Sequence, residues 1–214
     1  MIEYIQHIKE YLNYSHSSFS SLIPEGEWGN KGLAERYLHK YWLAEQEYQE
    51  KWKLIQDKIF VQDDGMPDLV YRPEFEMIAL RGGCLFAEED FNQLQKAMQE
   101  VGDNHFVIIQ LPQKFTEGEP MFKMKFPVNI TWDELKSGNY ISAVLLEMSY
   151  NEYFVFSESG NWGKYSANDF EQPLDIIGFK PDLECVFREQ FKQSLEEREE
   201  IKEWLPPKYK EIVK

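Results

Sequence analysis

The chain has 214 residues, of which 43% are hydrophobic, so it suits one compact domain or one domain with an appendage and excludes a disordered chain. Its 23 Lys and Arg against 38 Asp and Glu give a formal net charge of −15. Proteins that bind nucleic acids or anionic membranes need a basic surface, and the sequence has no run of Lys or Arg to form one, so we expect neither partner.

The first 62 residues are predicted to form a helical N-terminal part. Apolar residues at positions 1, 5, 8 and 12 have the spacing of an amphipathic helix, and residues 14–32, which are rich in Ser, Gly and Pro, are typical of a connection. Apolar side chains then recur at steps of three and four through residues 31–60, which predicts one long helix. Asp63, Asp64 and Gly65 favour a turn directly after it.

The remaining part, residues 70–214, is predicted to combine strands with helices. We expect a β-α-β unit at 75–111, whose helix ends at Gly102, and a short helix that begins after Thr131. A long C-terminal helix is expected from Pro181 onward. Further strands are expected at 122–126, 140–148, 153–156 and 162–166, and residues 174–179 are expected to add a strand or an extended edge.

Together these elements predict an α+β protein. We expect a mostly antiparallel sheet with packed helices, a helical N-terminal part and a long C-terminal helix, with both parts in one compact unit. Residues 1–10 carry acids where a secretory signal needs cations, and no stretch approaches the roughly 20 apolar residues of a membrane span, so we expect a cytoplasmic protein. Cys84 and Cys185 each lie beside apolar residues, which favours buried thiols.

No motif in the sequence indicates a reaction. The four histidines include no pair at helical spacing, and the sequence lacks a Cys/His cluster, a GxSxG nucleophile turn and the glycine-rich loops that hold nucleotide phosphates. We therefore expect no metal, no cofactor and no catalytic activity. His105, at the start of an apolar strand, is the one histidine that deserves inspection, although a surface or core role is the alternative.

Two groups of residues are candidates for contact with a partner. The densest acidic groups are Asp63 and Asp64 in the turn, and Glu88, Glu89 and Asp90 at the start of a helix. The alternative for the second group is that acids in a first turn offset the positive pole of the helix. The other group consists of two tryptophans, because Trp is enriched at the contacts that contribute most to binding in protein interfaces. Packing of a loop onto the core is the alternative for both tryptophans. They lie in or beside turns that contain glycine: Trp28 and Trp162.

The segment from Tyr153 to Tyr165, with Asn168-Asp169 and residues 174–178, resembles strand–turn–strand blocks of small acidic bacterial proteins, including immunity proteins of polymorphic toxin systems. The resemblance covers about thirty residues and brings no catalytic residue with it. It implies a protein that binds a toxin and blocks its active cleft. Many such toxins are nucleases with cationic clefts, which an acidic surface can occupy.

Three functions therefore remain open. The first is a non-enzymatic module that binds a basic protein, as an immunity protein does. The second is an enzyme with a carboxylate or histidine site in an aromatic-lined pocket, and the third is a structural or phage-type component with a large apolar patch. The sequence does not indicate the oligomeric state.

Overall fold

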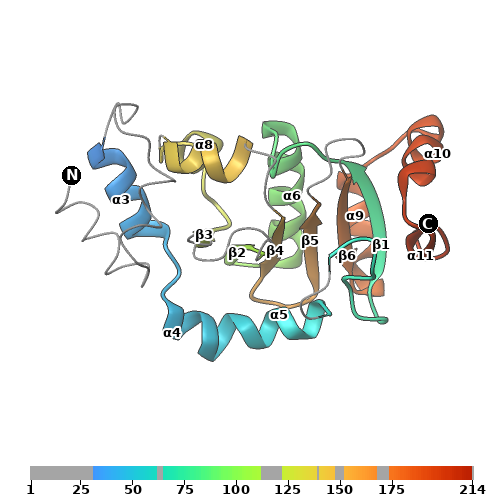
Figure 1. Cartoon of the computed structure of the whole chain (residues 1–214), viewed down its shortest axis with the longest axis horizontal. Coiled ribbons are helices and arrows are strands. Elements are labelled where there is room, and N and C mark those ends of the chain that lie inside the picture. The colour runs from blue at the N-terminus through green and yellow to red at the C-terminus, as the bar shows by residue number, and fades with distance from the viewer. Residues whose placement is uncertain are drawn as a thin grey trace.

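The computed structural model describes residues 31–61, 65–111, 122–138, 140–147, 152–167 and 174–213. Its centre is a six-stranded sheet in the order β1-β6-β5-β4-β2-β3, in which every neighbouring pair is antiparallel (Figure 1). The strands are β1 (Glu76–Arg81), β2 (His105–Gln110), β3 (Lys123–Pro127), β4 (Tyr153–Ser157), β5 (Trp162–Ser166) and β6 (Leu174–Phe179).

Helices flank the sheet on both sides (Figure 1). The first group consists of α3 (Lys31–Tyr41), α4 (Glu45–Glu47), the π-helical turn η1 (Tyr48–Trp52) and α5 (Lys53–Ile59). The middle of the chain adds α6 (Glu88–Val101), α7 (Trp132–Leu135) and α8 (Tyr140–Glu147). The C-terminal region adds η2 (Pro181–Leu183), α9 (Glu184–Gln190), α10 (Leu195–Trp204) and α11 (Pro207–Lys210).

Two apolar clusters divide the core. One unites buried residues of α3, α6, α7, α8 and α9 with side chains of the sheet, and the other unites η1, α5, α10 and α11 with different side chains of the same sheet. Strands β4, β5 and β6 are buried at every position, because alternate side chains enter opposite clusters. The described part of residues 1–62 therefore packs on the sheet that the rest of the chain forms.

A pair of glycines admits two aromatic rings against the middle of the sheet. Gly163 on β5 is directly opposite Gly178 on β6, and a Cβ atom at position 163 would lie 2.5 Å from the Phe60 ring. Phe60 in turn forms a β-bridge with Tyr71, whose ring lies against Gly178. The Tyr71 hydroxyl lies 2.6 Å from the carbonyl oxygen of Ile176, to which it donates. Because glycine has no side chain, the segment that carries Phe60 and Tyr71 packs directly on the backbone of β5 and β6.

The structure confirms the α+β class and the antiparallel sheet, but it corrects three elements. Residues 140–147 form helix α8, not a strand, so the three-stranded meander is β4-β5-β6. The predicted helix over 31–60 is interrupted at residues 42–44, where Trp42 bridges Met124 on β3 and the Leu43 amide donates to the Lys123 carbonyl. The C-terminal region is helical in short segments instead of one long helix. The predicted helix over residues 1–12 lies outside the described residues.

Candidate functional site

The acids predicted as a contact site begin helix α6. Glu88 and Glu89 are exposed, and Asp90 is half-buried. The N-cap residue, Ala87, has no side chain that could accept from the first-turn amides, so the three carboxylates supply the negative charge that this pole favours. The helix-pole alternative therefore accounts for their position, while leaving the outward side of the helix open to a partner.

The exposed side of α6 has a shallow depression of about 450 Å³. Its lining joins Glu88 and Glu89 to the amides of Asn92 and Gln93 and to the side chain of Lys96. Neither glutamate forms an ion pair with a residue that the structure describes. Four residues on the opposite side anchor the helix in the core: Phe91, Leu94, Ala97 and Met98. The depression is therefore an anionic feature on a firmly packed helix.

The prediction of an exposed anchor is wrong for Trp162. Its side chain is fully buried between β5 and α9, where the ring packs 5.8 Å from Phe187, and its indole donates to the Asp103 carboxylate at 2.8 Å. The neighbouring turn suggested exposure, but strand alternation directs this side chain into the core. The other candidates lie outside the described residues: Trp28, Asp63 and Asp64.

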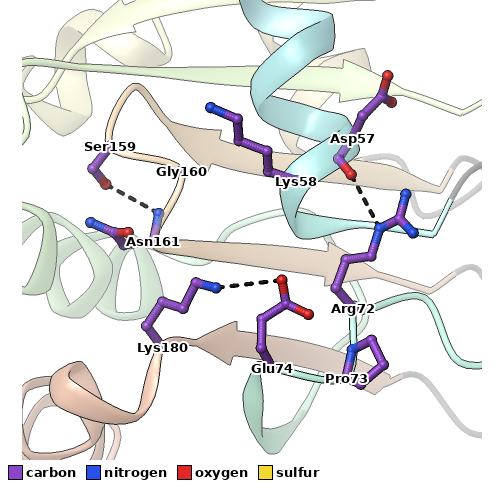
Figure 2. Close-up of a pocket in the computed structure, with 9 residues that line it drawn as sticks. All are labelled: Asp57, Lys58, Arg72, Pro73, Glu74, Ser159, Gly160, Asn161 and Lys180. Carbon is purple, nitrogen blue, oxygen red and sulfur yellow. Dashed lines mark hydrogen bonds and ion pairs between the residues drawn. The ribbon is translucent and has the colours of Figure 1, made fainter.

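A second hollow, of about 630 Å³, lies where α5 ends near the β4–β5 turn (Figure 2). Residues 57–58, 72–74, 159–161 and Lys180 line it, so four separate segments contribute. Its charged groups comprise three cations and two carboxylates, which gives a net charge of opposite sign to that of the whole chain. Sequence inspection missed this site because no spacing rule connects its segments.

Arg72 is positioned by the end of helix α5. Its Nε atom donates to the carbonyl oxygen of Asp57 at 3.1 Å, and its backbone amide donates to the carbonyl oxygen of Ile59 at 2.9 Å. Carbonyl groups in a last helical turn lack intrahelical donors, so both bonds satisfy groups that would otherwise remain unpaired. These bonds leave the two terminal nitrogens of the guanidinium available.

Lys180 and the β4–β5 turn form the other side of this pocket. Lys180 Nζ lies 3.5 Å from the Glu74 carboxylate and 4.6 Å from the centre of the Phe75 ring. A backbone hydrogen bond within Glu74, together with the charge of Lys180, lowers the pKa of the Glu74 carboxyl. In the turn, the backbone amide of Asn161 donates to Ser159 Oγ at 3.4 Å, and Gly160 adopts a left-handed φ of +67° that favours glycine.

A buried ion pair, Lys164–Asp175, belongs to the lining of neither hollow. Lys164 Nζ is 2.7 Å from Asp175 Oδ2, and each side chain is only 4% exposed. Lys164 also donates to the carbonyl oxygen of Leu85 at 2.6 Å and lies over the Phe86 ring. Burial raises the pKa of the Asp175 carboxyl, although Lys164 and Ser166 oppose that shift. The other oxygen, Oδ1, has no hydrogen-bond partner.

His105 belongs to a surface cluster, which is the alternative that the sequence left open. Its Nδ1 atom lies 3.5 Å from Glu158, and Lys51 Nζ lies 3.6 Å from the same carboxylate. Partial burial raises the pKa of Glu158, but hydrogen bonding to Asn104 and the proximity of Lys51 and His105 outweigh it and lower the pKa. The cluster links η1 to the β4–β5 turn at the surface.

Neither cysteine forms a disulfide bond, and Cys185 is exposed, so the prediction of a buried thiol is wrong there, whereas Cys84 is half-buried. Within the described ranges, no group of three or more His, Cys, Asp or Glu side chains could hold a metal ion. None of the helices described has both the length and the apolar character that crossing a bilayer requires. The chain matches no protein-family model, no curated protein and no solved structure.

Proposed function

We propose that this protein is a non-enzymatic binding module that meets a basic protein partner through the exposed side of helix α6. One observation carries the proposal: Glu88 and Glu89 are exposed, form no ion pair with a described residue, and border a depression that also offers two side-chain amides. Unpaired carboxylates attract Lys and Arg, and amides supply neutral hydrogen bonds beside them.

The charge of the whole chain supports the same mechanism. A net charge of −15 creates a long-range field that accelerates encounter with a cationic surface, and local complementarity then selects the orientation. Helix α6 is 14 residues long and packs firmly on the sheet, so little conformational entropy is lost when a partner docks on it.

The narrower form of the proposal is that the partner is a toxin domain. The resemblance of the β4–β5 segment to immunity proteins supports this form, in which the acidic side of α6 occupies a cationic cleft and excludes the toxin's substrate. The mechanism requires occlusion alone, and no bond is made or broken by the inhibitor.

The test uses charge reversal with a matched control. The reading frames beside this gene are searched for a basic toxin domain, and the association of such a domain with the wild-type chain is followed by surface plasmon resonance at several salt concentrations. If no basic domain is encoded there, the toxin form of the proposal fails. Glu88→Lys with Glu89→Lys should slow association by about tenfold or more and flatten its salt dependence. Glu196→Lys with Glu197→Lys, the same change of charge at the start of α10, should have a much smaller effect.

The two double variants distinguish direct contact at α6 from a general effect of the net charge of the chain. Equal losses from both pairs would show that only net charge matters, and would remove α6 as the contact. Salt-insensitive binding would overturn the electrostatic mechanism altogether. Substrate cleavage by the toxin, measured with and without this protein, then tests the narrower form.

A further inference from the structure

The pocket beside α5 concentrates cations in an acidic protein. Lys58 and Arg72 line it, and neither forms an ion pair with a residue that the structure describes. The two carboxylates of the lining are already engaged, since Asp57 pairs with Lys53 at 2.7 Å and Glu74 pairs with Lys180. The positive charge of the pocket therefore lacks an internal counterion of equal size.

The arginine is held in place before any ligand arrives. Its Nε atom is fixed on the Asp57 carbonyl, and its terminal nitrogens form a planar pair of donors without a described partner. Such a fork matches the oxygen spacing of phosphate and carboxylate groups. In Figure 2, Lys58, Arg72 and Lys180 border the pocket from three different segments.

The β4–β5 turn adds neutral donors at fixed positions. The Asn161 carbonyl accepts from the Lys180 amide at 2.8 Å, which ties the turn to the end of β6. The Asn161 side chain is exposed at the pocket and can donate through its amide. The ligand chemistry that satisfies three cations and an amide donor is a group with several anionic oxygens.

We propose that this pocket binds the phosphate group of a small organic phosphate. A phosphate monoester carries a charge between −1.5 and −2 near neutral pH and offers three terminal oxygens, whereas a carboxylate offers one charge and two oxygens. A volume of about 630 Å³ exceeds what phosphate alone fills and lies within the range of small-molecule sites.

Glu74 and Lys58 test the proposal because their removal should change the affinity for phosphate in opposite directions. The Glu74 carboxylate lies 3.5 Å from Lys180 Nζ and is half exposed, so a bound phosphate competes with it for the same lysine. Removing the Glu74 charge should therefore tighten phosphate binding, while removing the Lys58 charge should weaken it. A structural effect of either exposed side chain would not produce that pair of signs.

The experiment is isothermal titration of the full chain with glucose 6-phosphate, inorganic phosphate and glucose. We expect saturable binding of glucose 6-phosphate, weaker binding of inorganic phosphate and none of glucose. Lys58→Gln should raise the dissociation constant roughly three- to tenfold, and Glu74→Gln should lower it by about twofold or more. The control Lys202→Gln, an exposed lysine on α10 that lines neither hollow, should leave it unchanged.

Each remaining outcome overturns the proposal. These outcomes are absence of saturable binding, equal affinity for glucose and its phosphate, equal effects of Lys58→Gln and Lys202→Gln, or a loss of affinity in Glu74→Gln. Inorganic phosphate that binds as tightly as the sugar phosphate would assign the pocket to the free ion and overturn the organic ligand. None of these results affects the proposed role of α6, which the toxin-binding assay tests separately.

Discussion

The buried pair Lys164–Asp175 should be costly to break and inexpensive to replace. Both side chains are 4% exposed, and Asp175 Oδ1 already lacks a partner. In Lys164→Met the carboxylate would lose the cation that pairs with it among the described residues, and the bond from Lys164 to the Leu85 carbonyl would be lost as well. Leaving one buried charge unpaired costs about 3–5 kcal/mol, which is a large share of a typical stability of about 5–15 kcal/mol.

The same reasoning predicts recovery in a double variant. Lys164→Met combined with Asp175→Leu removes both charges, so no desolvated ion remains, and its free energy of unfolding should return to within about 1–2 kcal/mol of wild type. Urea unfolding followed by circular dichroism measures both variants, and the coupling energy comes from the double-mutant cycle. If Lys164→Met fails to fold while the double variant folds, the prediction is supported.

The pH dependence of stability provides an independent check on the buried Lys164–Asp175 pair. Because burial raises the pKa of Asp175 in the folded state, the folded form favours the protonated acid, and stability at this group falls as the pH rises through that pKa. Without Lys164 the pKa of Asp175 should rise further and the loss of stability should extend to higher pH, so the defect of Lys164→Met should be largest in alkali and smaller in acid. A defect below about 1 kcal/mol at neutral pH, or a double variant no more stable than the single one, would refute the account of a desolvated pair.

Three further changes test other parts of the fold. Gly163→Ala should cost about 1–3 kcal/mol in thermal unfolding because its new methyl group meets the Phe60 ring, and an unchanged melting temperature would contradict the close packing. Trp162→Phe should cost about 2 kcal/mol by removing the donor to buried Asp103, and binding to a toxin should survive if Trp162 is only a core residue. Burial raises the pKa of Glu152, so Glu152→Gln should be more stable than wild type at about pH 8 and equal to it at about pH 4; a pH-independent difference in urea unfolding would exclude this titration.

Elements that face the core on one side only were predictable from the sequence, because their apolar residues recur with a clear period. Helix α6 was predicted correctly because its apolar residues lie on one face and Gly102 ends it with φ of +85°. Helix α8 was mistaken for a strand because a short, almost wholly apolar run carries no clear period. The break after α3 was missed because the apolar spacing continues through Tyr41, Ala44 and Tyr48, while a contact of the Leu43 amide with distant β3 determines the backbone there.

The two candidate sites also differ in whether the sequence could predict them. Glu88 and Glu89 could be selected from sequence because a helix start combines a local pattern with predictable exposure. The group of Lys58, Arg72 and Lys180 could not, since the pairing of β5 with β6 and the return of the chain after α5 bring these residues together. Local sequence patterns do not predict such contacts between distant segments.

The two proposed sites are separated by the sheet. Helix α6 packs into one apolar cluster, while the end of α5 and the connection after it pack into the other. A phosphate bound beside Arg72 therefore touches no part of the α6 surface, and its charge acts on a partner there only through the field. Charges on opposite sides of a domain are largely screened at the Debye length of about 8 Å in physiological salt. Ligand and protein partner should consequently bind independently, and any strong coupling between them would require a conformational change of the sheet itself.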